Sequence, residues 1–293
     1  MTDASVSLAS GPDGAAKRHP LMSLAIHAVL IAVSLLMLYP LLWMISGSLK
    51  DQSQIFGQAA LLPKHLDFSA YWRGWHGTQI GFGTYFWNSL VISVLSVIGN
   101  VFSCSLAAYA FARLQFKGRS FWFALMLGTL MLPYHVTLIP QYILFLKLGW
   151  VNTILPLVVP KFLAVDAFFI FLMVQFFRGI PRELDEAAMM DGCSPWRIYW
   201  RIMMPLSLPV LATAAIFTFI WTWDDFFGPL IYLSDTSSYT VQLGLRSFVD
   251  STGSSDWSGL FAMSSLSLVP VFLIFLFFQR LLINGIATSG LKR

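Results

Sequence analysis

The chain carries little charge: 11% of its 293 residues are Asp, Glu, Lys or Arg, less than half of the roughly 25% typical of a soluble domain. Its two cysteines exclude a disulfide scaffold, and no group of Cys and His has the spacing of a zinc site. The chain also lacks a G-x-x-x-x-G-K-[ST] phosphate loop and a readable pairing of a nucleophile with a base. With a net charge of only +4, it is not expected to be an enzyme, a metalloprotein or a nucleic-acid-binding protein.

Long apolar runs dominate the sequence. Hydrophobic residues make up 57% of the chain, and its 26 Phe and 11 Trp suit a lipid-facing surface with interfacial aromatic residues. A spanning helix needs roughly 20 apolar residues, and six stretches reach that length, at about 21–46, 85–112, 120–143, 154–177, 206–232 and 260–283. Residues 1–19 are rich in Gly, Ala, Ser and Asp and predict a disordered tail. The sequence thus predicts an all-α membrane protein with one six-helix domain over 20–293.

The Lys and Arg residues of the loops predict the orientation. If the N-terminus is cytoplasmic, twelve of the 18 basic residues fall on the cytoplasmic side and five on the outer side, while Lys161 lies inside a span. Cytoplasmic loops are the ones that carry an excess of Lys and Arg. We therefore expect both termini, including the 1–19 tail, in the cytoplasm.

Small residues recur along the second predicted span at every third or fourth position. They are Ser89, Ser93, Ser96, Gly99, Ser103, Ala107 and Ala110. At that period they share one helical face, which predicts close packing against another helix in the membrane.

The predicted cytoplasmic loop at 182–205 has the signals of two short helices joined by a bend. Residues 182–190 are strong helix formers with acidic residues in the first turns, which suits the helix dipole. Gly192 lies where a C-terminal cap is expected, and Ser194 can cap a second helix that begins with Pro195. An amphipathic helix that covers the inner rim of the bundle is the alternative interpretation. We call residues 182–205 the elbow.

The elbow contains Glu186-Ala187-Ala188, followed at fixed distances by Gly192, Ile202 and Pro205. This spacing resembles the EAA signature of ABC importer permeases, with Met204 in place of the usual Leu, a volume-conserving change. Trp223-Asp224-Asp225-Phe226 is similar to the carbohydrate branch of that family, and residues 279–292 are similar to the C-terminus of its maltose-type second permeases. The resemblance covers about residues 20–293. Within the branch it extends to the second permeases of alginate importers.

The resemblance implies a non-catalytic subunit of the bacterial inner membrane. In this family two different permeases form the pathway, two cytoplasmic ATPase subunits bind ATP and Mg²⁺, and an outer solute-binding protein delivers the sugar. Carried over, the coupling residues are Glu186, Ala187, Ala188, Asp191, Gly192, Ile202 and Pro205. No cofactor is expected on this chain itself, whose direct contacts would be those subunits and lipid.

Polar residues in the spans are the candidates for the translocation path, because ionisable groups in a membrane are generally functional. They are Lys161, Asp166, Trp221, Trp223, Asp224 and Asp225. Five helical residues turn through about 140°, so Lys161 and Asp166 are not expected to pair. Carboxylates and aromatic rings suit sugar hydroxyls, although tryptophan near an interface is also a common membrane anchor. An anionic sugar would instead favour Lys161.

Two other transporter classes remain as alternatives. An ABC importer for a non-sugar solute would carry the same elbow. A secondary transporter driven by an ion gradient tends to contain internal repeats, and this chain has none that can be recognised.

Overall fold

The computed structural model describes residues 20–57, 63, 65–78, 80–249 and 255–290, and within these ranges the regular elements are all helices. The predicted tail at 1–19 lies outside them. In chain order the longer helices are α1 (Pro20–Gly47), α3 (Ser69–His76), α4 (Phe82–Arg113), α5 (Arg119–Thr129), α6 (Tyr134–Lys147), α8 (Ala167–Gly179), α9 (Glu183–Met190), α12 (Leu208–Trp223) and α15 (Trp257–Gly290). The shorter ones are α2 (Gln52–Gly57), α7 (Leu155–Val158), the 3-10 helix η1 (Val159–Leu163), α10 (Pro195–Ile198), the π-helix η2 (Tyr199–Met203), α11 (Met204–Leu206), α13 (Phe227–Tyr232), the 3-10 helix η3 (Thr236–Ser238) and α14 (Val241–Arg246). The predicted all-α class is confirmed.

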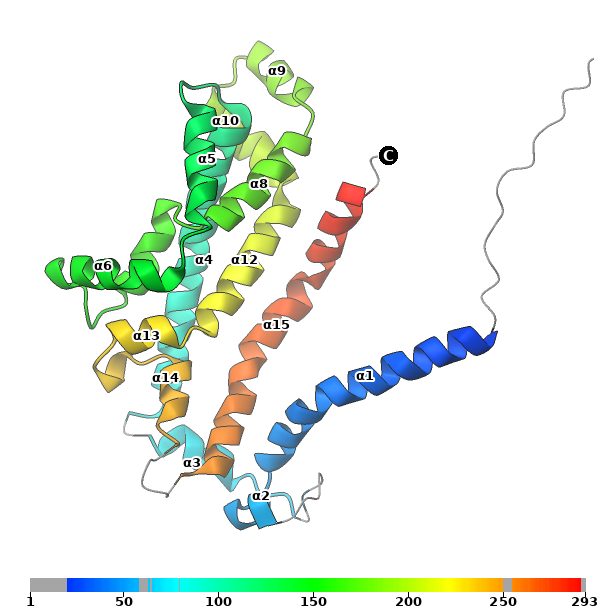
Figure 1. Cartoon of the computed structure of the whole chain (residues 1–293), viewed down its shortest axis with the longest axis vertical. Coiled ribbons are helices and arrows are strands. Elements are labelled where there is room, and N and C mark those ends of the chain that lie inside the picture. Colours follow the sequence, from blue (N-terminus) through cyan, green and yellow to red (C-terminus); the bar gives the residue numbers. More distant parts are fainter. Residues whose placement is uncertain (1–19, 58–62, 64, 79, 250–254, 291–293) are drawn as a thin grey trace, which may run out of the picture.

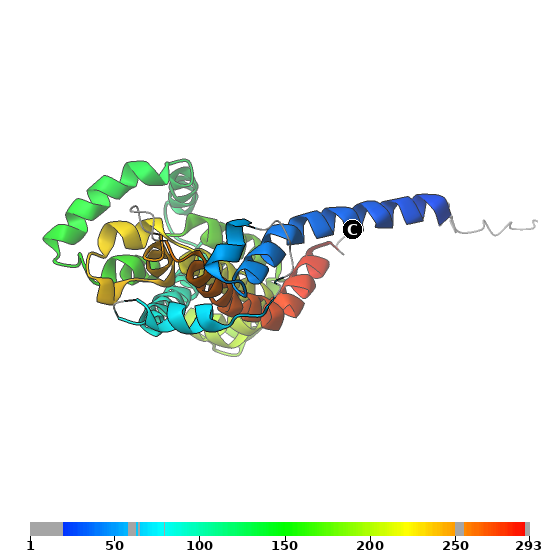
Figure 2. The ribbon, with the colours of Figure 1, turned by 90° about the horizontal axis from the view of Figure 1, so that it is seen from below.

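Helix α4 is the centre of the bundle (Figure 1). It packs against α8, η1 and α12, and α15 packs against the other side of α12. Two apolar cores lie at opposite ends of α4. One is built around Tyr109, Tyr199 and Phe177 near the elbow, and the other around Phe82, Trp223 and Met263 near α3 and α14. Helix α1 projects away from this body (Figure 2), and none of its most apolar stretch is buried.

The small-residue face of α4 is buried from Ser89 to Ser103 and partly buried at Ala107 and Ala110, which agrees with the predicted close packing. Ser93 and Ser96 have no exposed surface, and a Cβ atom at Gly99 would lie 2.5 Å from the Phe162 ring. Ser89 Oγ accepts a hydrogen bond from the backbone N–H of Val241, 2.9 Å away. The absence of bulk on this face therefore lets η1 and the start of α14 approach α4 closely.

The six predicted spans are not all continuous helices. Among the described residues, four stretches are long and apolar enough to cross a membrane: Met22–Gly47, Phe82–Arg113, Leu155–Gly179 and Trp257–Gln279. A fifth requires that Pro195–Leu206 and Leu208–Trp223, bent by 78°, count together. The count of six is therefore not confirmed.

The predicted third span, at about 120–143, is divided between α5 and α6. The break lies around Pro133, which is the N-cap of α6, because proline removes a backbone donor and clashes with the preceding turn. The predicted fifth span, at about 206–232, is likewise interrupted between α12 and α13. Both interruptions fall where a continuous helix was expected.

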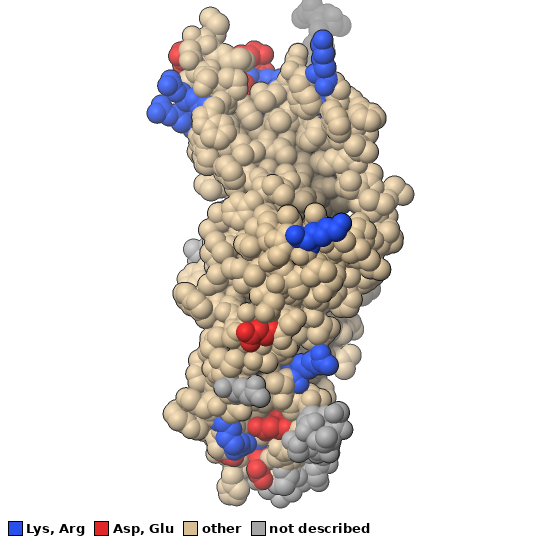
Figure 3. Space-filling model, turned by 90° about the vertical axis from the view of Figure 1, so that its left-hand side faces the viewer, with Lys and Arg blue, Asp and Glu red and all other residues tan. Residues whose placement is uncertain are grey.

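Charged side chains lie mostly at the two ends of the long axis (Figure 3). The face between the ends carries only scattered charged side chains on the side shown. This distribution suits a protein whose middle contacts lipid or other membrane helices and whose ends contact water.

Candidate functional site

The elbow forms the bend that the sequence predicts. Gly192 has φ of +75°, and its N–H donates to Met189 O at 3.0 Å, while Cys193 N–H donates to Ala188 O at 2.9 Å. These two bonds make a Schellman motif, in which a glycine with positive φ closes the end of a helix. Ser194 Oγ then accepts from Arg197 N–H at 3.4 Å, with Pro195 at the first position of α10. Glycine and the Ser-Pro pair thus build a bend between two helices.

The two faces of α9 differ in burial. Ala188 and Asp185 are buried, whereas Glu186, Ala187 and Asp191 are exposed. The signature places Ala187 and Ala188 side by side in the sequence, but consecutive helical residues point about 100° apart. Only Ala187 contributes to the outer surface, where its large neighbours are Met189 and Met190, the latter 89% exposed.

Arg113 holds the buried face of α9 in place. Its Nη1 lies 3.2 Å from Asp185 Oδ2, and its side chain is only 4% exposed. Its Nη2 donates to the C-terminal carbonyls of α8, Phe177 O at 2.6 Å and Ile180 O at 2.7 Å. One guanidinium therefore joins the end of α4, the end of α8 and the elbow. Sequence reasoning missed this role, although a single Arg at the end of a long apolar run was a visible signal.

The other two elbow residues of the signature lie within and just after the π-helix. Ile202 is in η2 and partly buried against the core around Tyr109, Tyr199 and Phe177, and Pro205 is exposed in α11. The chain bends by 78° after this segment. Ile202 and Pro205 therefore lie where the elbow turns into α12.

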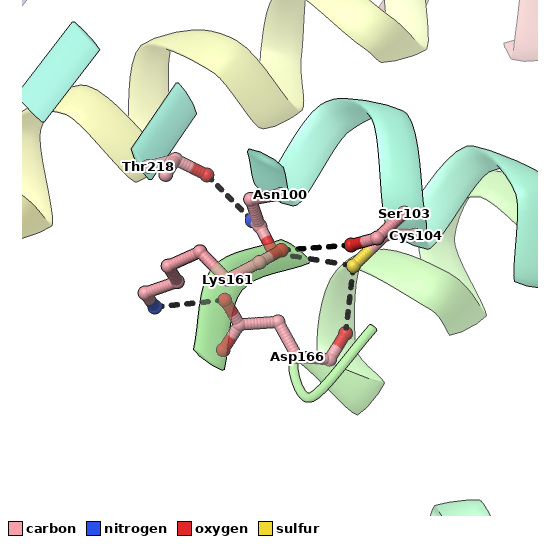
Figure 4. Close-up of polar contacts among 6 residues, drawn as sticks. All are labelled: Asn100, Ser103, Cys104, Lys161, Asp166 and Thr218. Carbon is pink, nitrogen blue, oxygen red and sulfur yellow. Dashed lines mark hydrogen bonds and ion pairs between the residues drawn. The ribbon is translucent and has the colours of Figure 1, made fainter. Parts of the chain in front are cut away.

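Lys161 and Asp166 form an ion pair, contrary to the sequence expectation. Lys161 Nζ lies 2.9 Å from Asp166 Oδ2 (Figure 4). The expectation assumed a continuous helix, but η1 ends at Leu163 and Ala164 adopts a left-handed conformation with φ of +54°. This reversal brings the two side chains to the same side, so the 140° separation does not apply.

A polar network on α4 fixes the two segments that carry this pair. Ser103 Oγ donates to Lys161 O at 2.8 Å, and Cys104 Sγ contacts Asp166 O at 3.8 Å (Figure 4). Asn100 joins the network, accepting from Cys104 and donating to Thr218 Oγ1 on α12 at 2.7 Å. The break in the fourth predicted span is thus held by side chains rather than by helical backbone bonds.

The tryptophans of the predicted path point in different directions. Trp223 is 1% exposed and donates from Nε1 to Ser267 O at 3.0 Å, so it fastens α12 to α15. Trp221 is 53% exposed and packs against Phe169, with ring centroids 5.3 Å apart. Of the two, only Trp221 is available to a ligand.

The two aspartates that follow α12 also differ. Asp225 Oδ1 accepts the backbone N–H groups of Phe227 and Gly228 at 3.0 and 3.1 Å and so caps α13. Asp224 Oδ1 lies 3.5 Å from Gln242 Nε2. A cavity of about 100 Å³ brings together Lys161, Trp221 and Asp225, whereas Asp166, Trp223 and Asp224 do not line it. Across the residues that the structure describes, no group of three or more His, Cys, Asp or Glu could hold a metal ion.

Comparison with known proteins assigns this arrangement to a family. Residues 99–288 match the family described as binding-protein-dependent transport system inner membrane component, and that match covers the elbow, the ion pair and α12. The chain belongs to this family. The permease is 35% identical over 254 residues to a probable ABC transporter permease protein, YurM, of Bacillus subtilis, covering 87% of this chain and 83% of the relative.

A second relative and a solved structure extend the comparison. The permease is 32% identical over 280 residues to the arabinooligosaccharides transport system permease protein AraQ of Halalkalibacterium halodurans, covering 94% of this chain and 99% of AraQ. Its fold matches a chain of a bacterial ABC transporter involved in the import of the acidic polysaccharide alginate, with a TM-score of 0.79 and 24% identity over 89% and 96% of the two chains. The permease fold is therefore that of an ABC importer subunit.

Proposed function

We propose that this permease forms half of the translocation pathway of a binding-protein-dependent carbohydrate importer and transmits ATP hydrolysis through its elbow. The observation that supports the proposal most is the elbow itself. A family signature lies on a capped bend whose Ala188 and Asp185 are buried while Glu186, Ala187 and Asp191 are exposed. The exposed face would contact the ATPase, and the buried face would pass its movement to α4.

The proposed partners are a second, different permease, two cytoplasmic ATPase subunits with ATP and Mg²⁺, and a solute-binding protein. The contact with another membrane subunit is supported by α1, since the most apolar part of this span is not buried by the rest of the described chain. Lipid would cover what the partner leaves exposed. Both termini would lie in the cytoplasm, as the distribution of Lys and Arg predicts.

Oligosaccharide is the proposed cargo because AraQ, whose length this chain covers almost completely, is named for arabinooligosaccharides. Alginate is a further candidate that rests on the fold likeness alone. A non-sugar solute is the alternative within the same family. Membership of this family disfavours the secondary-transporter alternative, because its members depend on a binding protein.

Reconstitution tests the proposal. The complete transporter, purified through this permease and placed in proteoliposomes with its binding protein, is expected to accumulate a labelled oligosaccharide only when ATP reaches the ATPase side. Uptake driven by a proton or sodium gradient without ATP would contradict the proposal. ATP-dependent uptake of a non-sugar solute, with no carbohydrate transported, would favour the alternative cargo.

Cysteine labelling tests the orientation. In a background with Cys193→Ser, a cysteine replacing the exposed Ser234 is expected to react with an impermeant maleimide from outside, and one replacing the exposed Met190 only after the membrane is opened. Cys104 can stay because it is fully buried. Labelling of the Met190 position from outside would reverse the proposed topology.

A further inference from the structure

The cavity beside the Lys161–Asp166 pair contains a polar atom that has no partner. Thr240 is 3% exposed, its Oγ1 makes no hydrogen bond, and it lines the cavity of about 100 Å³ with Lys161, Trp221 and Asp225. A buried hydroxyl without a partner is destabilising, and such groups in native structures call for an explanation. A ligand with hydroxyl groups would supply the missing bond.

The cavity offers the kinds of contact that a sugar uses. Trp221 provides a half-exposed aromatic face, and Thr240 Oγ1 can both donate and accept. Lys161 Nζ has three donor positions, one of which Asp166 occupies at 2.9 Å. Ser89 Oγ accepts from Val241 N–H and keeps its own hydrogen for another acceptor. Three segments far apart in the sequence, α4, η1 and the N-cap of α14, thus contribute polar residues to the lining of one cavity.

The charges of the cavity indicate which sugars it favours. Lys161 and Asp166 neutralise each other, and Asp225 adds one carboxylate to the lining. A second carboxylate brought by the ligand would be repelled by Asp225 in a region of low dielectric constant, whereas neutral hydroxyl groups can donate to it.

The size of the cavity limits what enters. Pockets for whole small molecules measure about 300–1,000 Å³, several times the volume of about 100 Å³ found here. Since one water occupies roughly 30 Å³ of liquid, the space suits the hydroxyl-bearing edge of one sugar ring. The remainder of an oligosaccharide would lie outside the cavity.

We propose that the cavity lined by Thr240, Trp221, Lys161 and Asp225 is a subsite of the translocation path that binds the hydroxyl-bearing edge of one neutral sugar unit and disfavours a uronate. The inference rests on the proposed function and narrows its cargo to neutral oligosaccharides. Asp166 is a positioning residue in this account, because it reaches the cavity through Lys161.

Thr240→Val tests the subsite most sharply. Valine keeps the shape and removes only the unpartnered hydroxyl, so a purely structural residue would tolerate the change or become more stable. Loss of a ligand hydrogen bond is expected to lower uptake at subsaturating substrate by about three- to tenfold, without a lower melting temperature of the complex. Ser96→Ala is the matched control, since its buried Oγ is also unpartnered but does not line the cavity.

Asp225→Asn tests the charge preference. Asparagine keeps the oxygen that accepts the two backbone bonds of α13 and removes only the charge. Uptake by the complete transporter in proteoliposomes would be compared for arabinotriose, maltotriose and diacetylchitobiose as neutral probes and for trimannuronate as the acidic probe. The wild type is expected to prefer a neutral probe, and Asp225→Asn is expected to raise acidic relative to neutral uptake at least threefold.

The outcomes separate this inference from the proposed function. Preferred uptake of trimannuronate by the wild type, or normal uptake by Thr240→Val, would overturn the neutral-sugar subsite while leaving a carbohydrate importer intact. An unchanged ratio in Asp225→Asn would overturn the charge argument. ATP-dependent uptake of a non-sugar solute alone would overturn the proposed function and the subsite with it.

Discussion

Two ion pairs of the permease lie in very different surroundings. Arg113 and Asp185 meet at 3.2 Å with side chains 4% and 13% exposed, and Lys161 and Asp166 meet at 2.9 Å with both side chains 29% exposed. The first is enclosed by the ends of α4 and α8 and by the elbow. The second borders a cavity. A closed pair suits a fixed joint between elements, whereas a partly open pair leaves donors free for a ligand.

Breaking the closed pair is expected to have the largest effect. Arg113→Ala leaves Asp185 buried without its counter-charge, a change that typically costs about 3–5 kcal/mol, and also removes the bonds to Phe177 O and Ile180 O. We expect a large fall in the melting temperature of the purified complex and poor co-purification of the ATPase.

Arg178→Ala is the control for that experiment. Arg178 lies near the same end of the molecule but is exposed, with its guanidinium 5.2 Å from the centre of the Phe123 ring. Its loss is expected to cost about 1 kcal/mol or less. Equal effects of the two substitutions would show that the enclosed joint has no special role.

The sequence could predict features that depend on neighbouring residues, but not features that depend on contacts between distant segments. Gly192, Ser194 and Pro195 act on their immediate neighbours, so their spacing was enough to predict the elbow. The ion pair of Lys161 and Asp166 depends on the left-handed Ala164 and on bonds from Ser103 and Cys104 on α4, which are tertiary contacts. Pro160 and Pro133 were visible as helix breakers, but the apolar runs around them outweighed that signal.

The burial of Ala188 is an intermediate case. Its helix was predicted, but which of two adjacent alanines faces the body depends on how α9 docks. That docking is determined by the contact of Asp185 with Arg113, more than 70 positions earlier in the chain. A local sequence pattern could not predict this docking.

The next largest effect is expected at Gly192. Its φ of +75° strains any residue with a Cβ atom by about 1–2 kcal/mol, and a tilted bend would misplace the exposed elbow residues. Gly192→Ala is expected to weaken substrate-stimulated ATP hydrolysis, and Gly192→Asp to abolish it, while the complex still inserts into the membrane.

Gly149→Ala provides a matched control. Gly149 also has a positive φ, of +68°, and a Cβ atom would meet nothing within 4 Å at either glycine. The two alanine variants should therefore lose similar stability, but only the one at Gly192 should lose coupling. Loss of coupling in both would mean that strain alone, and not the elbow, is responsible.

A smaller effect is expected from the half-open pair. In a double-mutant cycle with Lys161→Met and Asp166→Asn, the pair should show a coupling free energy of about 1 kcal/mol in the stability of the complex. A continuous helix over 154–177 would predict no coupling, so additive effects would contradict the broken span.

The smallest effect is expected in the loop at 234–239. The backbone N–H of Ser237 donates to Asp235 and lowers the pKa of that carboxyl, with a further contribution from the Ser237 side chain. A lowered folded pKa adds stability above the unfolded pKa of about 3.9, and this stability is lost as pH falls through the folded value. Protection of the Ser237 amide from hydrogen exchange, corrected for the intrinsic rate, should decrease below about pH 4. Asp235→Asn should remove this dependence, and an unchanged profile would contradict the role of the carboxylate.

Photocrosslinking from the elbow tests the central claim most directly. A photoreactive amino acid would replace Met190, which is 89% exposed, in the complete transporter, and the exposed Ser234, just after α13, would be the control. The account predicts a covalent adduct with the ATPase subunit from the Met190 position and none from Ser234. No ATPase adduct from the Met190 position, or an adduct from Ser234, would contradict the assignment of the elbow as the coupling surface.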